Sequence, residues 1–213
     1  MIVLGGMIGL GKTTTARMLG KALNLPVYYE SVDDNIILPY YYKESYENQL
    51  KYRYPFLLQL AFLKSRYHQI RRALKEKDAV MDRSIYEDKY FVKKNIEMGR
   101  LSLEERDIYL GLLDELMEEE PGQRSKAPEV MVYLTGSFDL AIEHIRKRGR
   151  AMELGEENLK YMKFMYDGYD DWFYSEYKES PAIIVNMDKR KVNENKEDQE
   201  WLINEVKKYL YKK

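Results

Sequence analysis

A glycine-rich stretch close to the amino terminus constrains this chain more than any other feature. Residues 6–13 read GMIGLGKT and fit the pattern G-x-x-x-x-G-K-[ST] at every position. The stretch follows a short apolar run and precedes a helical pattern, as a phosphate-binding loop (P-loop) does. Glycines let such a loop turn its backbone N–H groups toward phosphate oxygens, and the positive end of the following helix adds to the attraction.

The loop predicts which residues hold a nucleoside triphosphate. We expect Lys12 to reach the β- and γ-phosphates and the hydroxyl of Thr13 to ligate Mg²⁺. The complete predicted ATP-binding set is Gly6, Met7, Ile8, Gly9, Leu10, Gly11, Lys12, Thr13 and Thr14. Because kinases, GTPases and ATP-driven machines share such a loop, the motif alone leaves the activity open.

Short apolar runs alternate with helical patterns along the chain. The runs expected to be buried strands are residues 2–5, 27–30, 79–82, 130–134 and 183–185. The segments expected to be helical are 12–23, 46–77 with a break or kink at Pro55, 103–120, 138–147, 156–174 and 197–211. This alternation predicts an α/β fold of the P-loop NTPase type, with a doubly wound five-stranded parallel sheet flanked by helices in one domain over residues 1–213.

Composition narrows the partners and the compartment. The formal net charge is −1, so neither sign gives an argument for a nucleic-acid or membrane partner. The chain has no cysteine, which excludes disulfides and thiolate chemistry. No apolar run reaches the roughly 20 residues that span a bilayer. Because the amino terminus runs straight into the glycine loop instead of a secretory leader, we expect a cytoplasmic protein.

The ends of the second and third predicted strands carry charged side chains. Glu30 ends the second run, and Asp82 and Arg83 end the third. Ligands of an open α/β sheet lie beyond the carboxyl ends of its strands, so these residues are expected to converge near the triphosphate. A carboxylate there can accept a proton from an attacking hydroxyl, and an arginine can stabilise phosphoryl charge. Asp82 is expected to support Mg²⁺, directly or through water.

Several segments together resemble the deoxynucleoside kinase family, in the branch of deoxycytidine, deoxyguanosine and bacterial deoxyadenosine kinases. The matching segments are residues 6–13, Glu30, 56–59, 82–88 and 146–153. The resemblance implies transfer of the γ-phosphate of ATP, with Mg²⁺, to the 5′-hydroxyl of a deoxynucleoside. It also implies that Glu30 is the general base and pairs with Arg83. Ser31 and Met152 depart from the family pattern, where proline and a second glutamate are common.

The resemblance extends to the residues that would hold the acceptor. Gln59 matches the family glutamine whose amide pairs with the base. The edge of a base carries both hydrogen-bond donors and acceptors, and an amide supplies the matching pair. Arg66 and Asp88 match members that handle cytosine or purines rather than thymine. Tyr42 and Glu153 match the residues that hold the sugar 3′-hydroxyl. The expected acceptors are therefore deoxyadenosine, deoxyguanosine and deoxycytidine, and similarity to short bacterial members favours a purine.

The basic run 146–150 has two interpretations. In the first interpretation, the run is the solvated carboxyl end of a helix, where the negative pole of the helix dipole favours positively charged side chains. A P-loop kinase instead uses such a run as a lid that closes over the phosphates, which we expect here over about residues 146–155. Arg148 and Arg150 would then neutralise charge on the transferring group. The resemblance further implies a homodimer.

Two other functions fit part of the sequence. A nucleoside monophosphate kinase, such as thymidylate kinase, shares the P-loop and the Asp-Arg pair, but Glu30 would repel an acceptor that carries a phosphate. The Gly-Gly sequence typical of thymidylate kinases after that glutamate is also missing. A nucleotide-binding switch without an acceptor would need a second aspartate motif and switch loops, which the sequence lacks.

Overall fold

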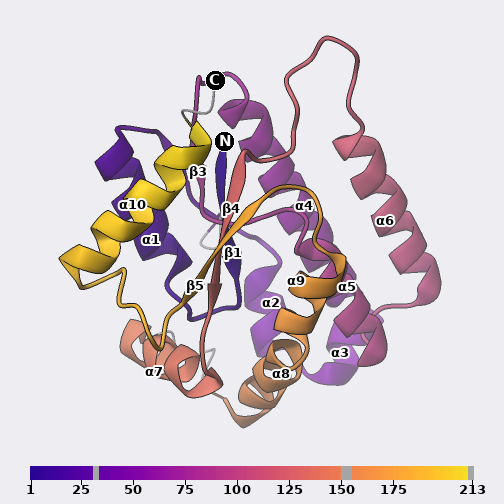
Figure 1. The fold of residues 1–213 in the computed structure, drawn as a ribbon. Helices are drawn as coiled ribbons and strands as arrows, with labels where there is room; N and C mark the ends of the chain where they lie inside the picture. The colour runs from indigo at the N-terminus through magenta and orange to yellow at the C-terminus, as the bar shows by residue number, and fades with distance from the viewer. Residues whose placement is uncertain (31–33, 150–154, 211–213) are drawn as a thin grey trace.

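Five parallel strands form the centre of the molecule. The computed structural model describes residues 1–30, 34–149 and 155–210. Within them the sheet has the strand order β2-β3-β1-β4-β5, and every neighbouring pair is parallel (Figure 1). The strands are β1 Ile2–Gly6, β2 Val27–Tyr28, β3 Val80–Met81, β4 Val130–Thr135 and β5 Ala182–Asn186. The predicted α/β fold with five parallel strands is confirmed.

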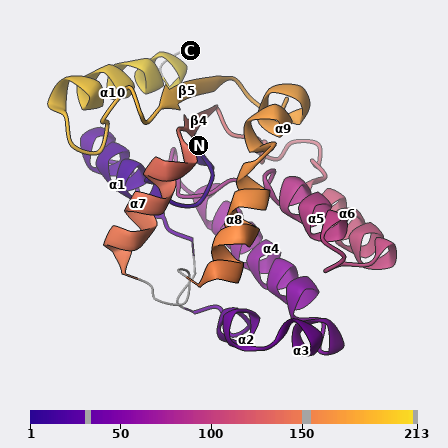
Figure 2. The same cartoon turned by 90° about the horizontal axis from the view of Figure 1, so that it is seen from below.

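Helices cover both faces of this sheet. They are α1 Lys12–Leu23, α2 Leu38–Lys43, α3 Tyr46–Lys51, α4 Tyr54–Ala73, α5 Asp88–Glu97, α6 Leu103–Met117, α7 Phe138–Arg148, α8 Glu156–Tyr166, α9 Tyr169–Glu176 and α10 Lys196–Leu210. Figure 2 shows α1, α7 and α10 on one side, α4, α5 and α6 on the other, and α8 between α7 and α4. Because side chains alternate along β1, Leu4 packs with the cluster that includes α1 and α10, while Val3 packs with α4 and α6.

Two long predicted helices are each divided. The segment 46–77 breaks at Arg53, which has a left-handed φ of 56°. Pro55 follows in the first turn of α4, where its missing N–H costs no helical hydrogen bond. The proline was therefore a correct signal for a break, although the break itself lies two residues earlier. The segment 156–174 breaks at Gly168, whose φ of 91° ends α8 before α9 begins.

Other boundaries also differ from the prediction. Strands β2 and β3 have only two residues each, and β2 is an edge strand that pairs only with β3. Helices α2 and α5 were not predicted, and α6 ends at Met117, before the expected residue 120. Helix α10 ends at Leu210, and the expected end at residue 211 lies outside the described residues. None of the helices in the described ranges is both long enough and apolar enough to cross a bilayer.

Candidate active site

A cavity of about 830 Å³ opens at the carboxyl edge of the sheet, and its volume is typical of a ligand site. Its wall comes from the phosphate loop and from α2, α4, α7 and α8. The predicted site residues that line it are Met7, Ile8, Gly9, Gly11, Lys12, Thr13, Thr14, Glu30, Tyr42, Gln59, Arg66, Asp82, Arg83 and Arg148. Gly6, Leu10 and Asp88 are buried and do not line it, and Arg150 and Glu153 lie outside the described residues.

The phosphate loop is held tightly against its surroundings. A Cβ atom on Gly9, whose φ is 90°, would come within 2.4 Å of the Ala141 carbonyl oxygen. Lys12 bends back over the loop, and its ammonium donates to the carbonyl oxygens of Gly6 at 2.7 Å and Met7 at 2.9 Å. Burial, aided by the charge of Arg83, lowers the pKa of Lys12 to about 8. A bound phosphate would supply the negative charge that this buried cation lacks.

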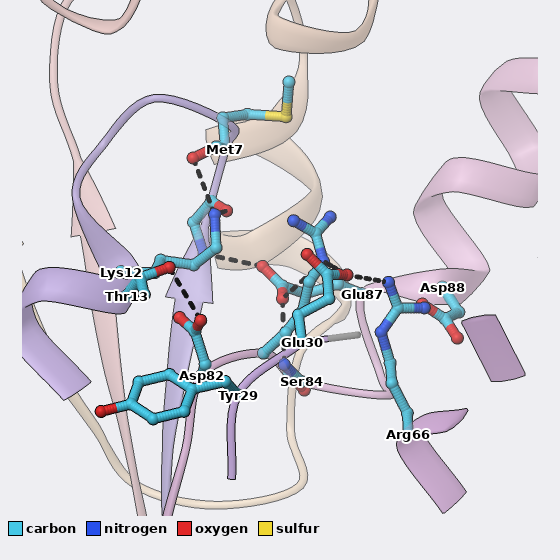
Figure 3. A network of polar contacts seen from close by, with 12 residues as sticks. Met7, Lys12, Thr13, Tyr29, Glu30, Arg66, Asp82, Ser84, Glu87 and Asp88 are labelled. Carbon is cyan, nitrogen blue, oxygen red and sulfur yellow. Dashed lines mark hydrogen bonds and ion pairs between the residues drawn. The ribbon is translucent and has the colours of Figure 1, made fainter. Parts of the chain in front are cut away.

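Thr13 and Asp82 meet at the base of the cavity. The hydroxyl of Thr13 donates to Oδ2 of Asp82 at 2.7 Å (Figure 3). The other oxygen, Oδ1, is buried without a hydrogen-bond partner in the described part of the chain. Burial raises the pKa of Asp82 to about 6, although Thr13 and Lys12 act in the opposite direction. A hydroxyl beside a carboxylate with one unused oxygen fits Mg²⁺, which prefers oxygen ligands and takes others from phosphates and water.

Glu30 lies between two arginines. Its Oε1 is 2.6 Å from Nη2 of Arg66 (Figure 3) and 3.6 Å from Nε of Arg83. Burial alone would raise the pKa of Glu30, but the charges of Arg83, Arg66 and Lys12 outweigh burial and lower it to about 2. The sequence pointed to Arg83 as the partner of this carboxylate, and the structure adds Arg66 at the shorter distance. Gln69 on α4 helps to fix the segment, because its amide donates to the carbonyl of Tyr29.

Arg66 also connects Glu30 to the buried Asp88. Its Nη1 donates to Asp88, and the other carboxylate oxygen of Asp88 accepts from the Tyr109 hydroxyl at 2.9 Å. Asp88 is fully buried, so only Arg66 of this pair faces the cavity. Gln59 lies seven residues before Arg66 on α4 and also faces the cavity. Its amide makes no hydrogen bond within the ranges that the structure describes, so it is available to a ligand.

Comparison with known proteins identifies the family. The chain matches the deoxynucleoside kinase family over residues 2–211. The chain belongs to this family. It is 38% identical over 213 residues to the deoxyadenosine kinase of Lactobacillus acidophilus, covering 99% of this chain and 96% of that protein. It is 37% identical over 209 residues to the deoxyguanosine kinase of the same organism, covering 97% of this chain and 89% of that protein. The monophosphate-kinase and switch interpretations are thereby set aside.

A solved structure shares the fold. The deoxyadenosine kinase of M. mycoides with bound dATP superposes with a TM-score of 0.78, over 97% of this chain and 98% of that one. Because the two chains are only 24% identical, the likeness shows a shared arrangement of the sheet and helices and nothing finer. It agrees with the five-stranded parallel sheet described above.

The basic run 146–150, which is expected from the sequence to form a lid, is described over residues 146–149. Helix α7 carries the first three residues of the basic run and ends at Gly149, which has a left-handed φ of 75°. Arg148 lines the cavity, on the same helix as His144. Nδ1 of His144 lies 2.7 Å from the carbonyl oxygen of Gly9, so α7 contacts the phosphate loop directly. This contact could not be assigned from the sequence, because His144 belongs to no recognised pattern.

Two further polar side chains near the site of this kinase, Glu87 and Arg100, had no role assigned from the sequence. Glu87 belongs to the segment 82–88 but had no assigned role, and it is fully buried against the phosphate loop. Arg100 donates to the Tyr41 hydroxyl at 2.8 Å and packs against the ring of Tyr161, which joins two walls of the cavity. Tyr41 and Tyr42 both line the cavity, and the Tyr41 hydroxyl is the one bonded to Arg100. A fully buried glutamate such as Glu87 is rare, but the sequence alone does not show that Glu87 is buried.

Proposed function

We propose that this deoxynucleoside kinase transfers the γ-phosphate of ATP to the 5′-hydroxyl of a purine deoxynucleoside, with Glu30 as the general base. The observation that carries the proposal is the position of the Glu30 carboxylate on the cavity wall, in the same cavity as the phosphate loop. The names of the two Lactobacillus relatives, which act on deoxyadenosine and deoxyguanosine, support a purine acceptor.

The reaction needs a proton acceptor for the 5′-hydroxyl. As its oxygen forms a bond to the γ-phosphorus, the bond to the ADP oxygen breaks and the hydroxyl proton moves to Glu30. Between Arg66 and Arg83 the carboxylate is ionised at neutral pH, and this pairing also makes it a weak base. An acceptor hydroxyl that displaces one of these arginines would raise the basicity of Glu30 at the moment it is needed.

Side chains around the loop would offset the negative charge of the triphosphate. Lys12 would contact the β- and γ-phosphates, and Arg148 and Arg150 would neutralise the transferring group as the lid closes. Thr13 and Asp82 would hold Mg²⁺, which when bound offsets the charge of the phosphate oxygens. The unused Oδ1 of Asp82 supports this assignment.

The acceptor would be recognised through its base and its sugar. Gln59 would pair with the base edge, and Arg66 would contact the base from a position fixed by Asp88. Tyr42 and Glu153 would hold the 3′-hydroxyl, so that the 5′-oxygen lines up with the γ-phosphorus. Such positioning supplies much of the catalysis in phosphoryl transfer.

We also infer a homodimer. Helix α6 exposes Ile108 at 62% and Leu112 at 42%, one turn apart on the same face. A second copy packed through this helix would cover both side chains, in agreement with the family resemblance. Light scattering after size exclusion tests the state: a dimer that Ile108→Glu converts to a monomer supports it, and a monomeric native protein contradicts it.

A substrate panel tests the activity. ADP formation from ATP and Mg²⁺ is measured with deoxyadenosine, deoxyguanosine, deoxycytidine and thymidine, and with their monophosphates. We expect the highest kcat/KM with one of the two purine deoxynucleosides. A preference for deoxycytidine would overturn the purine assignment, and activity confined to monophosphates would overturn the acceptor itself.

A further inference from the structure

Glu87 is a buried carboxylate that the reaction proposed above does not use. It is the N-cap residue of α5, and its side chain is 0% exposed. Acidic side chains are almost never buried to this extent unless they are paired. Its partners therefore indicate what it does.

The carboxylate of Glu87 joins three parts of the site, and Figure 3 shows its contact with Ser84. Its Oε1 accepts from the backbone N–H of Gly6 at 2.7 Å and from the hydroxyl of Tyr169 on α9. Its Oε2 accepts from the backbone N–H of Ser84 at 3.2 Å. The first residue of the phosphate loop is thus bonded, through one side chain, to the segment that carries Asp82 and Arg83.

Arg83 stands between this carboxylate and the proposed base. Its Nε is 3.6 Å from Oε1 of Glu30 and 3.9 Å from Oε2 of Glu87. This buried nitrogen makes no hydrogen bond to either, nor to any other residue in the described ranges. The guanidinium is therefore shared between two carboxylates and is not closed onto one of them.

We propose that Glu87 is a positioning residue that fixes Arg83 relative to the phosphate loop and keeps it from closing onto Glu30. The inference rests on the proposed role of Glu30. If the charge of Glu87 is removed, Arg83 pairs with Glu30 alone and that carboxylate becomes a poorer proton acceptor. The N–H of Gly6 also loses a charged acceptor, which loosens the start of the loop.

A purely structural role for Glu87 predicts a different outcome, and Glu105 supplies the matched control. Glu105 also lies at the start of a helix, accepts from the backbone N–H of Ser102 at 2.9 Å and pairs with Arg53. It does not line the cavity. Glu105 is 14% exposed, so Glu105→Gln reports what the loss of a largely covered, amide-bonded carboxylate at a helix start does to the fold alone.

The first experiment compares single variants of the full chain at saturating ATP and acceptor. We expect Glu87→Gln to lower kcat about 10- to 100-fold, and Glu105→Gln to change it less than about 2-fold. Tyr169→Phe removes one bond to Glu87 and keeps the ring, so we expect a drop of about 3- to 10-fold. If Glu87→Gln does not fold, Tyr169→Phe alone decides. A folded variant with the native kcat, or an equal loss in Glu105→Gln, overturns the inference.

The second experiment is a double-mutant cycle with Glu30→Gln. Because Glu87 acts through Arg83 on Glu30, its loss should cost less than about 3-fold in the Glu30→Gln background. Losses that multiply in the double variant overturn the inference and leave the role of Glu30 standing. A native rate in Glu30→Gln alone removes the proposed base, and with it the route by which Glu87 acts.

Discussion

Arg66 holds Glu30 through Nη2 at 2.6 Å, and the same guanidinium is bonded to Asp88 through Nη1. The residue expected to contact the base of the acceptor is therefore also the nearest cation to the proposed general base. A nucleoside that draws Arg66 toward its base would weaken the hold on Glu30 at the same time. With the roles proposed for Arg66 and Glu30, binding of the correct base and release of the carboxylate would be coupled by one side chain.

The amide variant Glu30→Gln tests the general base. It keeps the shape of the side chain but cannot accept the proton, so kcat should fall about 10²- to 10⁴-fold. The affinity for ATP should change little, because the triphosphate is expected to be held by the phosphate loop. Steady-state rates and ATP titration by calorimetry measure the two effects separately. A nearly native rate would remove Glu30 from the mechanism.

Asp88→Asn tests the buried ion pair. Asp88 is fully buried, and its removal leaves the charge of Arg66 without its second partner, so unfolding free energy should fall by about 3–5 kcal/mol. The matched control is Asp114→Asn, whose partner Lys89 is exposed, as is Asp114 itself. The control should cost less than about 1 kcal/mol. Urea unfolding compares the two, and equal losses would contradict the prediction.

The sequence predicted those parts of the structure that depend on local pattern and on general rules of topology. Helix α1 begins and ends where its pattern does, over residues 12–23, and α6 begins at the expected residue 103. The meeting of Glu30 and Arg83 followed from the rule that parallel strands present their carboxyl ends at one edge.

The remaining features depend on contacts between segments far apart in the chain. The pairing of Arg66 with Glu30 requires α4 to pass beside the end of β2, and no spacing in the sequence encodes that approach. Pro55 signalled a break in the segment 46–77, but its position at Arg53 depends on a left-handed backbone angle that no sequence pattern signals for a non-glycine residue. The sequence shows that residue 87 is a glutamate, but it does not show that this side chain is buried against Gly6.

Gly9→Ala tests the fit of the phosphate loop. The added methyl would meet the Ala141 carbonyl at 2.4 Å, and the backbone at φ 90° is unfavourable for alanine, so the loop must move. We expect ATP affinity to fall at least about 10-fold, since about 1.4 kcal/mol of distortion is enough for that. Gly111→Ala in α6, where no atom lies within 4 Å, should instead leave ATP binding unchanged and raise stability by about 0.5–1 kcal/mol. Unchanged ATP affinity in Gly9→Ala would contradict the prediction.

Asp82→Asn should separate stability from activity. Burial raises the pKa of Asp82 from its ordinary 3.8 to about 6, so the folded state binds this proton more tightly than the unfolded chain. The stabilising contribution of the protonated group is present below about pH 4 and is lost as pH rises through about 6. Because asparagine does not ionise, the variant does not undergo that loss. The free energy of unfolding of the variant, relative to that of the native chain, should therefore be higher at pH 7.5 than at pH 4 by about 1–3 kcal/mol.

The Mg²⁺ affinity of the native kinase should change with pH in the direction opposite to its stability. Mg²⁺ needs the ionised carboxylate, so in the native kinase its affinity should rise as pH increases through about 6, and the variant should lose this pH dependence. Urea unfolding at the two pH values measures stability, and titration of Mg²⁺ against the rate measures the site. A variant that gains no stability at pH 7.5 relative to pH 4 would show that the Asp82 carboxylate is compensated inside the fold. In that case the unused Oδ1 would have a partner, and the argument for a metal at this position would lose its main support.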